Sequence, residues 1–224
     1  WHPSPFMEKV FGQGWTEFET LKNSRPLYPG HLFPKYPLWG FWNEADPEWA
    51  QREIDAAADF GIDVWMIDWY WHSGTMFYHE QLENGFLKAR NRSKLKFALM
   101  WANHHWNNVY PARSPREAAT LLPQLHSEDD MLKVTDYCIE HYFREPNYWR
   151  IEGRPVFAIV LGNTLLSTVP GVSGAGPSPG KTVLTPILDS ELITHGDIRS
   201  RRMKPSTPTG CPTPAVITRA MMVL

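Results

Sequence analysis

One stretch of the sequence, residues 46–68, constrains the fold most because it predicts a helix, a glycine and a buried strand in immediate succession. Asp46 followed by Pro47 is typical of a helix start, where aspartate caps the first turn and proline takes the first helical position. Gly61 is typical of a residue that ends a helix. The run 62–68 is short, apolar and β-rich, which predicts a buried strand. This order indicates the second half of a parallel βαβ unit. The apolar stripe predicted for the helix consists of Trp49, Ile54, Ala57, Ala58 and Phe60.

The same order of elements recurs towards residue 160. Residues 96–101 are apolar and predict a second buried strand, and residues 156–160, introduced by Gly153-Arg154-Pro155, predict a third. Between them, Ser127 and the acidic residues that follow it predict the start of a second helix. The inward-facing residues predicted for that helix are Met131, Val134, Ile139, Tyr142 and Phe143. Strands that alternate with helices predict an α/β domain with a parallel sheet.

The spacing of these elements favours a barrel. Three such strands in about 100 residues match a (β/α)8 barrel of the TIM type, whereas no glycine-rich phosphate motif suggests a dinucleotide-binding fold. A full barrel takes about 250 residues, so we expect an incomplete (β/α)8 TIM-type barrel. Residues 1–42, rich in Pro, Gly and aromatic residues, are expected to form a long ordered loop region.

Composition changes sharply near residue 160. All of the 11 Trp, 8 Tyr and 11 Phe lie within residues 1–157, and residues 158–224 contain none. Pro, Gly, Ser and Thr make up nearly half of residues 162–224, a composition that buries little apolar surface. We therefore expect a barrel domain over residues 1–160 and a low-complexity, disordered tail over residues 161–224. The preferred interpretation is that this tail is not the natural continuation of the domain, for instance through a shifted reading frame or a misjoined gene model, and the alternative is an ordinary flexible tail.

Charge and cysteine content argue against several classes of protein. The 22 Lys and Arg nearly balance the 24 Asp and Glu, for a net charge of -2, which argues against a dedicated nucleic-acid binder. No apolar run reaches the roughly 18 residues of a membrane span, so we expect a soluble protein. Cys138 and Cys211 show no metal spacing and cannot form a disulfide framework, and we expect neither a metal nor a cofactor. The sequence begins with Trp1, so a signal peptide is either absent or removed, and the compartment, cytoplasmic or otherwise, stays open.

Two strand ends, residues 68–72 and residues 101–106, combine aromatic with polar side chains. In a barrel, active-site groups project from the C-terminal ends of the strands and from the loops that follow. Aromatic rings offer flat apolar area for the C–H face of a sugar, while carboxylate, amide and imidazole groups bind its hydroxyls. These runs therefore predict a sugar site. Because side chains alternate along an extended chain, about half of residues 69–71 should pack under helices, and at most one of His104 and His105 should enter the cleft.

Longer motifs in the same region resemble a known family. The segments that carry the resemblance are Gly14-Trp15-Thr16-Glu17-Phe18, residues 22–31, 36–40, 46–47, 61–63, 68–71 and 97–104, and Gly153-Arg154-Pro155-Val156-Phe157. Together they are similar to the N-terminal part of the glycosyltransferase WbsX family, also described as glycoside hydrolase family 99-like, over residues 1 to about 160. The resemblance implies a (β/α)8 barrel whose first strand and later half are missing here, and a glycan or oligosaccharide substrate. It also implies acid–base glutamates in that later half, so the catalytic residues of this chain stay unknown.

The resemblance also completes the set of candidate site residues. The candidates for substrate binding are Trp15, Glu17, Asp68, Tyr70, Trp71, His72, Trp101, Asn103, His104 and Trp106. Trp71 and Trp106 are expected to supply stacking faces, Asn103 and His104 to hold hydroxyls, and Asp68 to orient one of these groups or accept a hydrogen bond from the sugar.

Three functions stay open at this point. The first is a glycan-processing protein of the glycosidase type, truncated and catalytically incomplete, in which Glu17 and Asp68 are the carboxyl groups expected near the site. The second is a glycosyltransferase of O-antigen-type polysaccharide biosynthesis, for which the sequence shows no basic phosphate cradle. The third is a non-catalytic glycan-binding or non-functional fragment.

Overall fold

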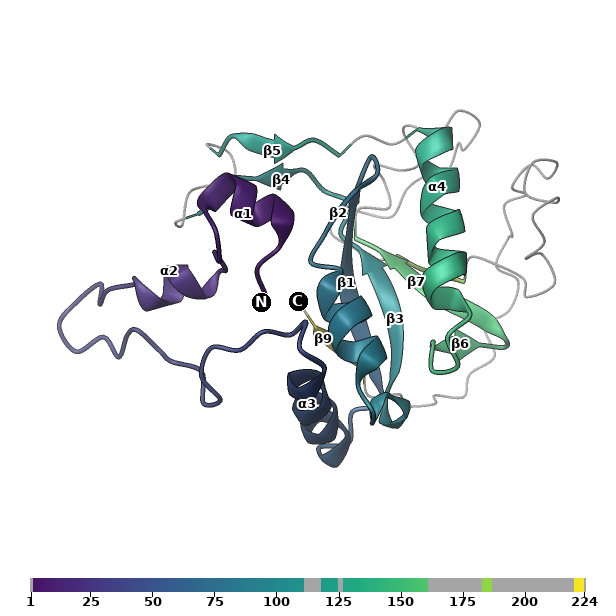
Figure 1. Ribbon diagram of the computed structural model, residues 1–224, viewed down its shortest axis with the longest axis horizontal. Helices are drawn as coiled ribbons and strands as arrows, with labels where there is room; N and C mark the ends of the chain where they lie inside the picture. Colours follow the sequence, from purple (N-terminus) through teal and green to yellow (C-terminus); the bar gives the residue numbers. More distant parts are fainter. Residues whose placement is uncertain (1, 111–117, 125–126, 161–182, 187–219, 224) are drawn as a thin grey trace.

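The computed structural model describes residues 2–110, 118–124, 127–160, 183–186 and 220–223. Its centre is a sheet in which β1 (Val64–His72), β3 (Lys96–Trp101) and β7 (Arg154–Ile159) run parallel to one another (Figure 1). The register places Asp68 opposite Met100 and Leu99 opposite Phe157. The parallel α/β arrangement predicted for these three segments is therefore confirmed.

Strand β1 continues to His72, past the end predicted at residue 68. Its last residues pair with the antiparallel strand β2 (Thr75–Phe77), so that Tyr70 lies opposite Phe77. The two residues between the strands, Ser73 and Gly74, both have positive φ angles, 49° and 86°. A two-residue hairpin of this kind requires that backbone because its twist matches the twist of the strands. The aromatic residues at the end of β1 favour an extended strand. The turn at Ser73 and Gly74 then lets the chain return as β2 and pair with β1.

Two short helices interrupt the region predicted as one long loop. They are α1 (Pro5–Phe11) and α2 (Phe18–Lys22). Proline at the first helical position suits the start of α1, because its fixed φ is helical and its missing N–H has no partner in the first turn. After α2, residues 24–46 form turns and irregular chain up to the next helix, as predicted.

Helix α3 (Pro47–Asp59) begins where the sequence predicts. The Asp46 carboxylate accepts a hydrogen bond of 2.9 Å from the Glu48 N–H, and Gly61 follows the helix with a φ of 77°. Ala50, Ile54 and Ala57 are buried. The prediction that Phe60 belongs to the buried stripe is wrong, since 84% of it is exposed. Phe60 lies beyond the last residue of the helix, where the helical period no longer directs side chains inward.

Helix α4 (Glu128–Cys138) is capped by Ser127, whose hydroxyl accepts a hydrogen bond of 3.1 Å from the Asp130 N–H. A π-helical turn, η4 (Ile139–Phe143), continues it, and β6 (Arg150–Ile151) then pairs antiparallel with β7. Of the residues predicted to face inward, Val134, Ile139, Tyr142 and Phe143 are buried and Met131 is half-buried.

The connection from β2 to β3 consists of η1 (Gln81–Gly85), η2 (Phe86–Lys88) and η3 (Arg92–Lys94).

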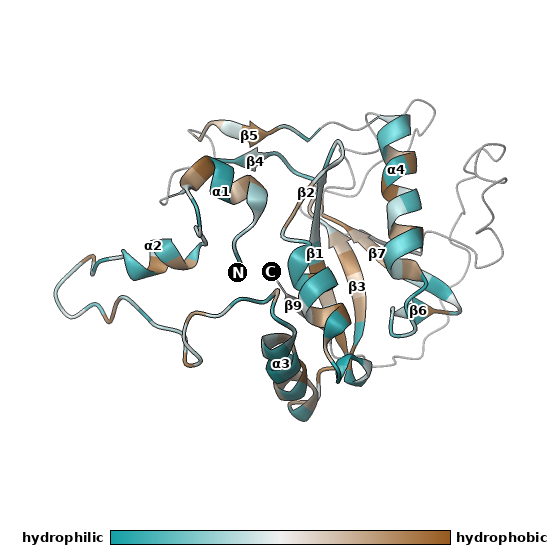
Figure 2. Ribbon diagram, in the orientation of Figure 1, coloured by the Kyte–Doolittle hydropathy of each residue, from teal (hydrophilic) through white to brown (hydrophobic). Residues whose placement is uncertain are grey.

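The apolar side chains form two clusters. The larger one lies between the sheet and the helices α3 and α4, and the strands β3 and β7 that border it are largely apolar (Figure 2). The second, smaller cluster consists of Met7, Tyr70, Phe77, Tyr78, Ala102 and Trp106. It brings α1, the hairpin of β1 and β2, and the chain after β3 together.

Three further strand pairings complete the described part of the chain. The strand β4 (Trp106–Asn107) pairs antiparallel with β5 (Thr120–Leu122). The strand β8 (Val183–Pro186) pairs antiparallel with β7, and β9 (Ala220–Val223) pairs parallel with β1. These two strands fall inside the predicted tail 161–224, and the rest of that prediction lies outside the described residues.

Candidate functional site

Strand β1 presents two rows of side chains. Ile67, Trp69 and Trp71 belong to the larger cluster under the helices. Tyr70 belongs to the smaller cluster, on the other face, because side chains alternate along a strand. Asp68 and His72 share the face of Tyr70 by the same alternation. This second face, near the C-terminal end of the sheet, is where the candidate site lies.

Asp68 is a buried carboxyl group of this face, with only 7% of it exposed. Its Oδ2 accepts a long hydrogen bond of 3.4 Å from the Tyr70 hydroxyl. Its Oδ1 is buried and finds no hydrogen-bond partner within the described residues. Burial raises the pKa of Asp68 to about 6, against the opposing effects of the Tyr70 hydrogen bond and of His104. The carboxyl group is therefore able to exchange a proton close to neutral pH.

The end of β1 and the loop after β3 meet at this face, as the sequence predicts. A ring nitrogen of His72, Nε2, lies 3.0 Å from the backbone oxygen of His104. The His104 ring stacks on Trp106, with 6.2 Å between ring centroids, and Trp106 packs edge to face on Tyr70 at 5.3 Å. These contacts bring His72, His104, Trp106 and Tyr70 close to one another. Asn103, two residues beyond the end of β3, is also buried.

Glu17 forms a second polar centre with two tyrosines that the sequence analysis did not single out. Its Oε1 accepts hydrogen bonds from the Tyr110 hydroxyl at 2.8 Å and from the Tyr78 hydroxyl at 3.1 Å. Its Oε2 is buried and has no partner in the described part of the chain. Burial is the largest cause of the raised pKa of Glu17. Trp15 packs against the Tyr110 ring at 5.2 Å and so joins the same centre.

The two polar centres lie within one aromatic cluster. The rings of Tyr70 and Tyr78 pack edge to face at 6.1 Å, and each hydroxyl bonds one of the two carboxylates. Nothing in the local sequence around Tyr78 or Tyr110 indicates a polar partner for Glu17. The turn after β2 brings the Tyr78 hydroxyl to Glu17, and the chain after β4 brings the Tyr110 hydroxyl to it.

Two predicted site residues, Trp71 and Trp101, are not brought to this face. Trp71 is 6% exposed and belongs to the larger cluster, where its indole N–H donates to the Asp130 carboxylate of α4 at 2.9 Å. Trp101 is fully buried in the same cluster, and its indole N–H donates to the Trp71 backbone oxygen at 3.2 Å. The cause is register: Trp101 pairs with Trp69 of β1, on the helix side of the sheet. The geometry thus gives Trp71 a packing role in place of the expected stacking face.

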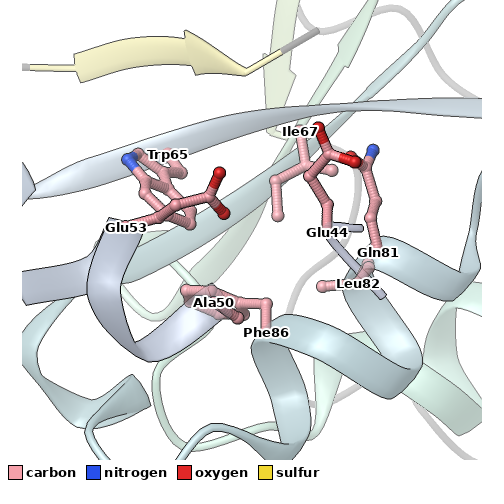
Figure 3. A pocket seen from close by; sticks show the side chains of 8 residues that line it. All are labelled: Glu44, Ala50, Glu53, Trp65, Ile67, Gln81, Leu82 and Phe86. Carbon is pink, nitrogen blue, oxygen red and sulfur yellow. The ribbon is translucent and has the colours of Figure 1, made fainter. Parts of the chain in front are cut away.

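A small pocket lies on the helix side of β1 (Figure 3). It is lined by Glu44, Ala50, Glu53, Trp65, Ile67, Gln81, Leu82 and Phe86. The Trp42 indole N–H donates to Glu53 at 2.8 Å, yet burial and the nearby Glu44 raise the pKa of Glu53 to about 7. None of the candidate sugar-binding residues lines this pocket. Sequence analysis missed Glu53 because it faces inward beside the apolar stripe of α3.

The described residues show neither a metal-binding group nor a membrane-spanning helix. No group of three or more His, Cys, Asp or Glu side chains there is arranged to hold a metal ion. Among the helices in the same residues, none has the length and apolar character needed to cross a bilayer.

Comparison with known proteins places the chain in a family. Residues 1–169 match the family described as Glycosyltransferase WbsX. This chain belongs to the WbsX family. The uncharacterized protein WxcX of Xanthomonas campestris pv. campestris is 27% identical to this WbsX-family chain over 159 residues, which are 70% of the chain and 22% of WxcX. The chain therefore spans about a fifth of the length of this relative.

Two further likenesses differ in kind from the WbsX match. The UPF0284 protein of Thermococcus gammatolerans is 51% identical over 65 residues, 29% of the chain and 20% of that protein. The structure of the GH99 endo-alpha-mannosidase from Bacteroides thetaiotaomicron superposes with a TM-score of 0.37 and 18% identity, covering 59% of this chain and 37% of that one. A superposition at this level carries no argument about activity.

Proposed function

We propose that this WbsX-family chain supplies the glycan-binding face of a glycan-processing protein. One observation carries the proposal: Asp68 Oδ1 and Glu17 Oε2 are buried carboxyl oxygens with no hydrogen-bond partner among the described residues. A buried polar atom without a partner costs about 1 to 3 kcal/mol. A sugar hydroxyl donates the hydrogen bond that each of these oxygens lacks, so binding would recover part of that cost.

The surroundings of the two carboxyl groups support a sugar over other hydroxyl-bearing ligands. Trp15, Tyr70 and Trp106 place aromatic rings around them, and such rings suit the apolar face of a pyranose. Burial raises the pKa of both Asp68 and Glu17, so an anionic ligand would increase an electrostatic cost that already exists. A neutral oligosaccharide is therefore the proposed ligand class.

Entry of a sugar requires a change in the cover of this face. Met7 of α1 is fully buried in the smaller cluster, together with Tyr70 and Trp106. The chain before α1 is held by the contact of His2 Nε2 with the Glu80 carboxylate at 3.0 Å. We expect α1 to move away when a glycan binds. Faster hydrogen exchange of the α1 amides in the presence of the oligosaccharide would register that movement.

The chain by itself is proposed to bind glycans and to turn them over slowly or not at all. The resemblance to the family puts the acid–base glutamates outside this sequence, and Glu17 is committed to two tyrosine hydroxyls. A second candidate function, transfer of a sugar from an activated donor, is favoured by the name of the matched family. Release of products without a donor indicates a hydrolase, and transfer that depends on a nucleotide-linked or lipid-linked donor indicates the second candidate.

The binding proposal is tested by calorimetric titration of the full chain with a panel of neutral oligosaccharides that includes α-mannan fragments. Asp68→Asn removes an acceptor oxygen while keeping the shape of the side chain, and Trp106→Ala removes a ring of the same face. Each is expected to weaken binding about ten- to a hundredfold, which corresponds to about 1 to 3 kcal/mol.

Phe60→Ala is the matched control, because it removes an aromatic ring that is 84% exposed and distant in sequence from the site. It should leave the affinity unchanged. Equal affinities for the wild type, Asp68→Asn and Trp106→Ala, measured on folded proteins, would contradict the proposal. Unfolding of the Trp106→Ala chain would leave the Asp68→Asn measurement to decide.

A further inference from the structure

We infer that this chain joins segments of two protein families, a WbsX segment followed by a UPF0284 segment that begins between residues 157 and 169. The inference goes beyond the proposed function, because it assigns the C-terminal part of the chain to a different family. Three observations support a change of family in this part of the chain.

The first observation is the size of the two kinds of match. WxcX is 27% identical over 159 residues, whereas UPF0284 proteins of Aeropyrum pernix and Thermococcus gammatolerans are 49% and 51% identical over 71 and 65 residues. The 159 residues of the WxcX match and the 65 residues of the Thermococcus gammatolerans match sum to 224, the length of the chain. The lengths of 65 and 71 residues are also close to the 67 residues of the aromatic-free stretch 158–224. Two matches of such unequal identity indicate two separate ancestries.

The second observation is composition. The later strands and helices of a (β/α)8 barrel need the same bulky core residues as the earlier ones, because they fill the same interior. Residues 1–157 contain every Trp, Tyr and Phe of the chain, and residues 158–224 contain none. A continuing barrel would not change its core composition within a few residues.

The third observation is topology. In a repeating β/α pattern, the strand that follows β7 returns through a helix and joins the sheet parallel to its neighbour. The next described strand, β8, instead pairs antiparallel with β7, with Ile159 opposite Val183. Among the described strands, β8 therefore breaks the parallel order beside β7, where the aromatic residues also stop, while β9 lies parallel to β1 at another position of the sheet.

This assignment decides between the alternatives that the sequence left open for the tail. A shifted reading frame yields a sequence that natural selection has not shaped, and such a sequence does not reach about half identity with an existing family over 65 residues. An unselected flexible extension fails for the same reason. The residues of the candidate sugar site, from Trp15 to Trp106, all lie in the WbsX segment, so the UPF0284 segment contributes none of them.

The first test determines which residues of this chain match the UPF0284 protein. Residues 1–157 and residues 158–224 are aligned separately with the Thermococcus gammatolerans protein. The matched residues are expected to fall in the second segment, apart from a few at its start. A match that lies within residues 1–157 overturns the inference. So does a shifted frame, downstream of the Phe157 codon in the source DNA, that encodes an aromatic-rich continuation similar to WxcX.

The second test asks whether the segment can replace its counterpart. In the Thermococcus gammatolerans protein, the matched 65 residues are exchanged for the aligned residues of this chain. The hybrid is expected to keep the unfolding transition that is measured for the unaltered protein in parallel. An exchange for residues 93–157, a control of equal length from the WbsX side, is expected to abolish the transition. Two hybrids that behave alike would contradict the inference, and the glycan titrations of Asp68→Asn and Trp106→Ala are independent of either result.

Discussion

The two faces of β1 carry similar residue types and serve different purposes. On the helix side, Trp69 and Trp71 stack at 5.7 Å and pack under α4, and the Trp71 indole N–H is satisfied by Asp130. On the other side, Tyr70 packs beside Asp68, whose Oδ1 has no partner in the described residues. The comparison teaches that aromatic density along a strand does not locate a sugar site. The helix side also holds buried polar atoms without a partner in the described residues, Trp69 Nε1 and Asp130 Oδ2. What separates the faces is that the second one brings two such carboxyl groups, Asp68 and Glu17, to a single aromatic cluster.

The largest effect is expected for Trp71→Ala on the helix side. Removing a buried tryptophan typically costs about 3 to 5 kcal/mol, and here it also leaves the Asp130 carboxylate without its indole donor. Urea unfolding of the full chain should show this loss of stability. Trp71→Phe, which keeps most of the ring, should cost less. Weakened glycan binding with unchanged stability would show instead that Trp71 belongs to the site.

Gly85→Ala tests how closely the helix side is packed. A Cβ atom at this position would lie 2.0 Å from the backbone oxygen of Glu44, which cannot move as a flexible side chain can. Overpacking of this kind costs about 1 to 3 kcal/mol. Gly14→Ala is the control, because its Cβ meets nothing within 4 Å and only the backbone φ of 75° opposes it. Equal destabilisation of the two variants in thermal unfolding would show that the contact with Glu44 relaxes.

Each face also holds a carboxyl group whose pKa is raised, which gives the comparison a pH dependence. Burial and Glu44 raise the pKa of Glu53 to about 7 from 4.5. Between these values the folded chain binds more protons than the unfolded chain, so this group's contribution to stability is full below pH 4.5 and is lost as the pH rises to about 7. Glu53→Gln should therefore raise the melting temperature at pH 8 more than at pH 5. An identical shift at both pH values would mean that Glu53 stays ionised throughout.

The contribution of Asp68 to stability should also fall as the pH rises, but over a lower pH range than that of Glu53. The pKa of Asp68 is raised to about 6 from 3.8, so its contribution is lost as the pH rises between these values. Asp68→Asn is expected to stabilise the chain at pH 7 relative to pH 4 and, at the same time, to weaken glycan binding. That opposition distinguishes a site residue from a packing residue such as Trp71. Lower stability at pH 7 would indicate that Asp68 has a structural partner.

Glu17→Gln is expected to have the smallest effect on stability. The amide oxygen of glutamine can still accept from the hydroxyls of Tyr78 and Tyr110, and the substitution removes a buried charge. We expect a change within about 0.5 kcal/mol. Glu17→Leu, which removes the acceptor and leaves both hydroxyls unsatisfied, should cost about 1 to 3 kcal/mol. Chemical denaturation of the pair measures the difference, and equal stabilities would mean that the hydroxyls find water instead.

The amino-acid sequence predicted the elements whose causes are local. Asp46 and Ser127 cap the helices they were expected to cap, since a capping side chain acts on an N–H two or three residues away. The apolar runs in β1, β3 and β7 predicted buried parallel strands, because a strand covered on both faces needs apolar residues on both. The meeting of residues 68–72 with residues 103–106 also follows from the parallel order.

Tertiary structure decided which side chains face which way, and which polar atoms have partners. Alternation states that Tyr70 and Trp71 point to opposite faces, but the register with β3 and the position of α4 determine which face the helices cover. The partners of Glu17 come from Tyr78 and Tyr110, far along the chain, and the pKa of Glu53 depends on the burial of α3 against β1. Such effects depend on contacts between residues distant in sequence, and a local pattern contains no information about them.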